Sequence, residues 1–244
     1  PPHRSRFPMK NTLLLLLALV SPSLLAAAVP SPAVLTSGFI NQGAPYPSCH
    51  ASTIVETAPG QLVAAWFGGT AERNPDVGIW VARHEGGRWL PGVEVANGVQ
   101  PTGPRLPTWN PVLFQPRGKA PLQLYYKVGP SPQTWWGELR TSADGGRTWS
   151  AARRLPEGFY GPIKNKPVQL KDGTILSGSS AEGLKVGPSW QIHFERSRDN
   201  GLTWEKIKVD QGQGSPASIQ PSILFLKDGS LLSLGRTRNG KVFS

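Results

Sequence analysis

The sequence of 244 residues contains one cysteine, Cys49, and four histidines, at positions 3, 50, 84 and 193. A single cysteine excludes an intrachain disulfide, so the apolar core and the packing between its parts must stabilise the fold. It also excludes a zinc site built from several thiolates, and the histidines show no ligand spacing. We therefore expect no metal and no cofactor, although calcium sites built from oxygen ligands leave no such signature in a sequence.

Sustained helical periodicity is also missing. After residue 30 no segment keeps the 3.6-residue apolar repeat of an amphipathic helix. Short apolar segments, rich in β-branched and aromatic residues and bounded by Gly, Pro or Asp, occupy residues 62–67, 77–81, 122–126 and 223–226. The chain therefore reads as all-β, and the lack of an amphipathic helix argues against binding at a membrane surface.

Acidic residues are scarce. Fifteen Asp and Glu stand against 26 Lys and Arg, which gives a formal net charge of +11. Such a surface favours anionic partners. The basic residues are scattered and form no run interleaved with aromatics, so a nucleic-acid partner is not expected. Acidic glycans that carry sialate, uronate or sulfate fit the charge better.

The longest apolar run lies near the N-terminus. Lys10 precedes the apolar segment 13–20 and the small residues 26–28, which is the order of a secretory signal peptide. The run is too short to span a membrane. We expect residues 1–8 to be upstream or non-native sequence, 9–28 a signal peptide, 29–46 a linker and 47–244 the folded part. The protein is then secreted or periplasmic.

Two eight-residue segments, 142–149 and 197–204, share the pattern S-x-D-x-G-x-T-W and begin 55 residues apart. The Asp side chain can hydrogen-bond nearby backbone, the Gly can take a positive φ, and the Trp can pack as an anchor. A degenerate copy ends at Trp89, 60 residues before Trp149, and a Lys-Asp-Gly turn at 171–173 returns at 227–229. The chain therefore consists of repeats of about 55 to 60 residues.

Short strands repeated at this spacing are typical of β-propeller blades. With its two Asp-boxes, also called BNR repeats, the chain resembles the sialidase (neuraminidase) superfamily over residues 47–244. The resemblance implies a six-bladed propeller in the full protein, of which this sequence is a truncated fragment of about three and a half blades. In that family the Asp-boxes lie on outer turns, so Asp144 and Asp199 are assigned to the fold and not to chemistry.

The alignment of the repeats indicates where a site would lie. One polar residue precedes the first strand of each repeat at steps of 60, 56 and 54 residues: His50, Asn110, Lys166 and Gln220. Inner strands of a propeller begin beside its axis, so these side chains should converge on one mouth of the tunnel. Turns on the same face supply Glu72, Trp135, Glu182 and Arg236. Structural roles stay open for His50, for Asn110 and Gln220 as backbone caps, and for Trp135 as packing.

Compared residue by residue, the chain departs from the sialidase pattern. Residues 47–52 read Pro-Ser-Cys-His-Ala-Ser where the family has its first substrate-binding arginine, and residues 218–220 lack the glutamate that polarises the tyrosine nucleophile. Asp76 is the nearest match to the acid/base aspartate, and Arg236 matches the second arginine. The tyrosine and the third arginine would lie beyond Ser244.

The resemblance implies a secreted glycoside hydrolase of the exo-α-sialidase type that acts on acidic oligosaccharides or polysaccharides. In this interpretation Asp76 or Glu72 is the acid/base and His50 assists proton transfer. The substrate contacts are Asn110, Lys166, Gln220, Arg236, Glu182 and Trp135. Two alternatives stay open: a polysaccharide lyase or uronate-glycan hydrolase that uses His50 at the axis, and a non-catalytic glycan-binding propeller.

Overall fold

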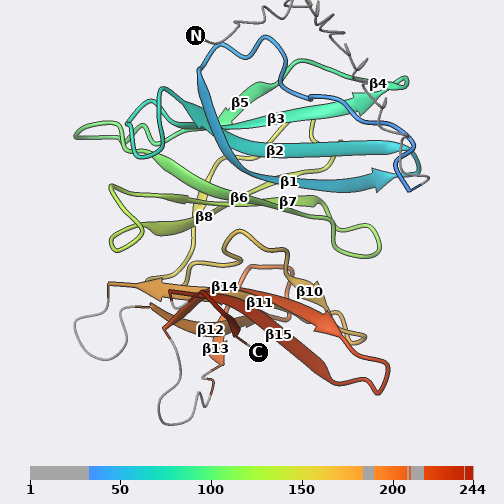
Figure 1. Cartoon of the computed structure of the whole chain (residues 1–244), viewed down its shortest axis with the longest axis vertical. Coiled ribbons are helices and arrows are strands. Elements are labelled where there is room, and N and C mark those ends of the chain that lie inside the picture. Colours follow the sequence, from blue (N-terminus) through green and yellow to red (C-terminus); the bar gives the residue numbers. More distant parts are fainter. Residues whose placement is uncertain (1–32, 184–189, 208, 210–216, 239, 244) are drawn as a thin grey trace, which may run out of the picture. The chain divides into compact units, whose positions relative to one another are not determined.

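The computed structural model describes residues 33–183, 190–207, 209, 217–238 and 240–243 (Figure 1). The chain divides into two units, Pro1–Gly38 and Phe39–Ser244, and every strand of the described residues lies in the second. Residues 1–8 and the predicted signal peptide at 9–28 lie outside the described residues. No helix in the described ranges is long and apolar enough to cross a membrane.

The first two sheets come from residues 48–154, and each is antiparallel. The first has the order β1-β2-β3-β4, with β5 also paired to β3; its strands are β1 (Ser48–Ala58), β2 (Gln61–Gly69), β3 (Gly78–Glu85), β4 (Arg88–Trp89) and β5 (Val93–Ala96). The second has the order β6-β7-β8-β9, with β6 (Thr108–Phe114), β7 (Leu122–Val128), β8 (Trp136–Ser142) and β9 (Arg153–Arg154).

The next two sheets repeat this plan, from yellow to red in Figure 1. The third has the order β10-β11-β12-β13, with β10 (Val168–Gln169), β11 (Ile175–Glu182), β12 (Trp190–Ser197) and β13 (Glu205–Ile207). The fourth has the order β14-β15-β16, with β14 (Ser218–Phe225), β15 (Leu231–Thr237) and β16 (Val242–Phe243). Sequential antiparallel strands in each repeat confirm the predicted all-β fold with propeller-type blades.

Apolar cores lie between successive sheets. Every residue of β6 and β7 is buried, since both faces of this second sheet are covered. One core joins Val63 and Phe67 of β2 to Leu124 and Tyr126 of β7. The next joins residues of the second sheet to Ile175 of β11. Burial on both faces explains why these strands read in the sequence as continuous apolar runs.

The Asp-boxes form the predicted turns and also connect neighbouring sheets. In the first copy Asp144 accepts hydrogen bonds from the Thr148 hydroxyl at 2.6 Å and the Thr148 amide at 2.9 Å, which hold its pKa well below the usual range. Trp149, which ends this copy, packs into the core between the first and second sheets. Trp204 of the second copy packs into the following core, with its ring centroid 6.0 Å from that of Tyr125. Each box therefore anchors its own sheet to the preceding one.

Candidate functional site

The first strand of three sheets carries a bulge at the same place. The regular pairing breaks between His50 and Thr53 in β1, between Trp109 and Val112 in β6, and between Ile219 and Ser222 in β14. The residue that follows the break has a positive φ: 55° at Ala51, 42° at Asn110 and 55° at Gln220. Non-glycine residues in this region cost about 1 to 3 kcal/mol each, so the recurrence marks a backbone feature that all these repeats keep.

The third repeat reaches the same conformation at Lys164, whose φ is 65°. Ile163 before it donates to the Gly178 carbonyl at 3.3 Å, and the ladder resumes only at Val168, opposite Leu176. The third repeat therefore has two more residues between its bulge and the resumed strand pairing than the second repeat has. The structure thus places Lys164, and not Lys166, at the position of Asn110. In the first repeat, Ala51 and not His50 takes this position.

A cavity of about 300 Å³ lies beside these bulges. Seven of the nine residues singled out from the sequence line it: His50, Glu72, Asn110, Trp135, Glu182, Gln220 and Arg236. They come from all four repeats, as the alignment of the repeats predicted. The other two, Asp76 and Lys166, are not among its lining residues.

The cavity also has lining residues that the sequence reasoning did not select. The main ones are Arg73, Lys164, Trp190 and Arg238. Arg238 follows Arg236 by two residues and lies just beyond the end of β15 at Thr237, so its nearness to Arg236 in the sequence was an available signal. Arg73 adjoins Glu72 in the turn after β2. Lys164 was hidden by the two extra residues in its repeat.

His50 and Glu72 lie beside each other in the lining of the cavity. His50 Nδ1 lies 3.9 Å from Glu72 Oε2, and the two side chains are 63% and 52% exposed. The imidazole edge rests against Phe67, with ring centroids 5.5 Å apart. Both side chains are therefore accessible from the cavity.

Glu182 lies at the centre of a group of arginines. Burial raises the pKa of this carboxyl group, while the charges of Arg236, Arg238 and Arg73 act in the opposite direction. The guanidinium carbons of Arg236 and Arg238 lie 5.2 and 4.5 Å from the ring centroid of Trp190. Cation–π contact orients both groups, so this wall carries guanidinium groups in fixed positions.

Asp76 shapes the loop that carries Glu72 and Arg73. Its carboxylate accepts hydrogen bonds from the Thr70 amide at 2.7 Å and the Thr70 hydroxyl at 2.6 Å, and the hydroxyl is the main cause of its lowered pKa. Arg105 donates to the Asp76 carbonyl at 2.9 Å. These bonds close the loop at both ends, with Glu72 and Arg73 between them.

Trp135 and Trp109 form an almost fully buried aromatic floor. Their ring centroids are 5.9 Å apart with planes at 67°, and Trp109 Nε1 donates to the Gly129 carbonyl at 2.8 Å. Trp135 is 6% exposed. The packing role left open for Trp135 is therefore visible in the structure, in addition to its place on the cavity wall.

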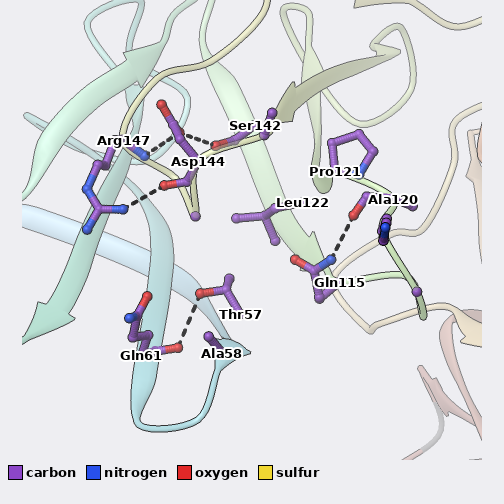
Figure 2. Close-up of a pocket in the computed structure, with 14 residues that line it drawn as sticks. Thr57, Ala58, Gln61, Gln115, Ala120, Pro121, Leu122, Ser142, Asp144 and Arg147 are labelled. Atoms are coloured by element: carbon purple, nitrogen blue, oxygen red, sulfur yellow. Dashed lines mark hydrogen bonds between the residues drawn. The ribbon is translucent and has the colours of Figure 1, made fainter.

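A larger cavity of about 450 Å³ lies at the other end of β1, beside the first Asp-box (Figure 2). Three of its polar side chains are tied to neighbouring groups: Thr57 donates to the Gln61 carbonyl at 3.3 Å, Gln115 to the Ala120 carbonyl at 3.0 Å, and Arg147 to the Asp144 carbonyl at 2.9 Å. Since these groups already serve the turns, the smaller cavity with its cluster of cations is the candidate site.

Residues 60–244 match the family model of the BNR repeat-like domain. The chain belongs to this family. Among solved structures, the BNR repeat-like chain is similar to the NanB sialidase of Streptococcus pneumoniae, with a TM-score of 0.62 and 11% identity over 80% of this chain and 49% of that one. It is also similar to a protein of unknown function from Dyadobacter fermentans, with a TM-score of 0.60 and 17% identity over 79% of this chain and 63% of that one.

A curated relative is the mouse protein dispatched homolog 2, 30% identical over 113 residues, which are 46% of this chain and 8% of that protein. The BNR repeat-like chain thus spans less than two thirds of each of these three proteins. At these identities the structural likenesses establish a sialidase-like propeller fold, and the activity has to be argued from the cavity.

Proposed function

We propose that the chain belongs to a secreted glycoside hydrolase of the exo-α-sialidase type, and that the 300 Å³ cavity binds the acidic sugar at the end of a glycan. The observation that carries the proposal is the arginine group around Glu182. Within the described ranges, none of Arg73, Arg236 and Arg238 has a carboxylate oxygen within 4.0 Å. The guanidinium groups of Arg236 and Arg238 are held against Trp190 without such a carboxylate partner, which suits a carboxylate ligand.

The remaining wall suits the neutral part of a sugar. Asn110 and Gln220 offer amide groups for hydroxyl groups, and Trp135 supplies apolar surface. Lys164 adds a fourth cation from the third repeat. Lys166 does not line the cavity, and its ammonium group donates a hydrogen bond to Thr53 at 3.2 Å. We therefore assign it a supporting role outside the cavity.

Hydrolysis adds the hydroxyl of a water to the anomeric carbon and requires a proton on the departing oxygen. We assign Glu72 as the acid/base, because it lines the cavity, and His50 as its proton-exchanging neighbour at 3.9 Å. Asp76 is the alternative acid/base from the family pattern. Its lowered pKa favours the carboxylate form, which suits a base better than an acid.

A second candidate function is cleavage at a uronate by His50, through elimination or through hydrolysis. The exposed position of His50 on the cavity wall favours it, as does the absence of an arginine in residues 48–52. A third is glycan binding without turnover. Export through a signal peptide at residues 9–28 is part of all three proposals.

The experiment that separates these functions uses the protein with a sialylated trisaccharide and with a uronate-containing polysaccharide. Release of free sialic acid supports the sialidase-type hydrolase. Unsaturated uronates, detected by their ultraviolet absorbance, would show a lyase instead. New reducing ends without that absorbance would show a uronate hydrolase. Binding without any product would leave a glycan-binding propeller, and failure to bind either glycan would overturn the proposal.

A further inference from the structure

A buried polar network lies behind the candidate cavity, between the second and third sheets. Lys127 of β7 and Glu195 of β12 are both fully buried. Lys127 Nζ donates to the Pro162 carbonyl at 3.0 Å, and the Glu195 carboxylate accepts the amides of Tyr160 at 3.1 Å and Gly161 at 2.7 Å. Two charged side chains therefore hold three consecutive residues of one connecting segment.

The segment leads directly to the cavity. Ile163, the next residue, is fully buried against Trp109 and Trp135, and its amide donates to the Gly178 carbonyl at 3.3 Å. Lys164 follows in the left-handed conformation and lines the cavity. Residues 160 to 163 are thus each held by a hydrogen bond, and they directly precede Lys164.

The network extends to His193, whose Nε2 lies 2.8 Å from Glu195 Oε1 and whose ring faces that of Tyr160 at 6.2 Å. Burial lowers the pKa of Lys127 to about 7, and the negative charge of Glu195 opposes this effect. Buried charges of this kind seldom add net stability, because apolar side chains of similar volume stabilise a core as well or better. Their presence here calls for a role other than stability.

We propose that Lys127 and Glu195 are positioning residues that hold the segment from Tyr160 to Ile163 and thereby fix Lys164 in the candidate cavity. The role toward a ligand rests on the proposed function, in which Lys164 contributes to binding an acidic sugar. The hold on the segment itself does not depend on that function.

The first test is a double-mutant cycle on the affinity for free sialic acid, measured by titration calorimetry. Lys127→Met should weaken binding about tenfold in the native chain and should have no further effect when Lys164→Ala is already present. Lys206→Met is the matched control, because Lys206 Nζ also donates to a carbonyl of this connection, that of Gly158 at 2.9 Å, but on the exposed side. Equal weakening by Lys127→Met in both backgrounds would overturn the positioning role.

The second test needs no ligand. Glu195→Gln keeps the side-chain shape and should raise the hydrogen-exchange rate of the Tyr160 and Gly161 amides at least tenfold, while exchange in β2 and β6 is unchanged. Unchanged exchange at both amides would contradict the proposal. If the native chain fails to bind sialic acid while Glu195→Gln still speeds amide exchange, the result contradicts the proposed function. It still supports the role of Glu195 in holding the segment.

Discussion

The ammonium nitrogen of Lys166 lies 3.2 Å from the hydroxyl oxygen of Thr53, a residue 113 positions earlier in the chain. The same oxygen accepts the Leu113 amide at 3.3 Å. One hydroxyl in the first repeat therefore receives hydrogen bonds from the second and third repeats. Desolvation at this place lowers the pKa of Lys166.

Thr53→Val should destabilise the protein by about 1 to 3 kcal/mol, because it leaves the buried Leu113 amide without an acceptor at nearly constant volume. Urea unfolding measures the change. Thr57→Val, on the same strand, removes a hydroxyl that, among the described residues, bonds to its own turn at Gln61, and it should change the free energy of unfolding by less than about 0.5 kcal/mol. Equal effects of the two substitutions would show that Thr53 does not join the repeats.

Arg238→Gln should weaken binding of free sialic acid about 10- to 100-fold, since a charge-assisted hydrogen bond contributes about 1.5 to 3 kcal/mol. Calorimetric titration of the ligand measures the effect. The control is Arg154→Gln: Arg154 stacks on Trp136 at 4.3 Å in the same manner but does not line the cavity. A comparable loss of affinity in the control would rule out a specific contact at Arg238.

His50→Ala should reduce the turnover of a cleavable acidic glycan about 10²- to 10⁴-fold if His50 exchanges the catalytic proton. Initial rates at saturating substrate give the comparison. His84→Ala serves as the control, because His84 packs on Trp89 at 5.3 Å in an outer hairpin. Full activity of His50→Ala would remove His50 from the chemistry.

Glu182 should make anion binding depend on pH. Its pKa is raised by burial, so as the pH falls toward that pKa the carboxylate takes up a proton and the arginine group loses its internal negative charge. Affinity for an acidic sugar should therefore rise as the pH decreases from 8 toward 5. Glu182→Gln should bind more tightly at pH 8 and show a flatter profile in the same titrations. An unchanged profile would show that Glu182 does not act on the ligand.

Lys127 should make the protein more stable as the pH rises above about 7. Its pKa in the folded state is lowered to about 7, whereas the unfolded chain keeps the ammonium protonated to about 10.4. Between these values the unfolded state binds more protons, so the free energy of unfolding increases with pH. Urea unfolding at pH 7 and pH 9.5 should show a smaller increase for Lys127→Met than for the native chain. Lys206→Met should keep the native slope.

The fold was readable from the sequence because the Asp-box has fixed offsets. A Gly four residues after a Ser, followed by Thr and Trp, demands one turn geometry, so two copies set the length of the repeat and hence the blade. The cavity region followed from the same spacing, and seven of the nine selected residues lie on one cavity. Their chemical roles stay predictions.

The exact register was not readable. The bulge position holds Ala51, Asn110, Lys164 and Gln220, which are one apolar side chain, two amides and one cation, so no single residue type marks it. Two extra residues before Val168 then moved the alignment in the third repeat from Lys164 to Lys166. The burial of Lys127 was also not predictable, because a lysine at the end of an apolar strand is usually exposed. Here the segment at Pro162 covers it.

The recurrence of a left-handed residue beside the cavity has a consequence for protein engineering. Side chains as unlike as those of Ala51 and Lys164 occupy the same backbone conformation, so the conformation does not depend on the side chain that it presents. Simultaneous randomisation of these positions, with Asn, Asp and Gly favoured for their tolerance of positive φ, should yield libraries of folded variants in which ligand preference varies.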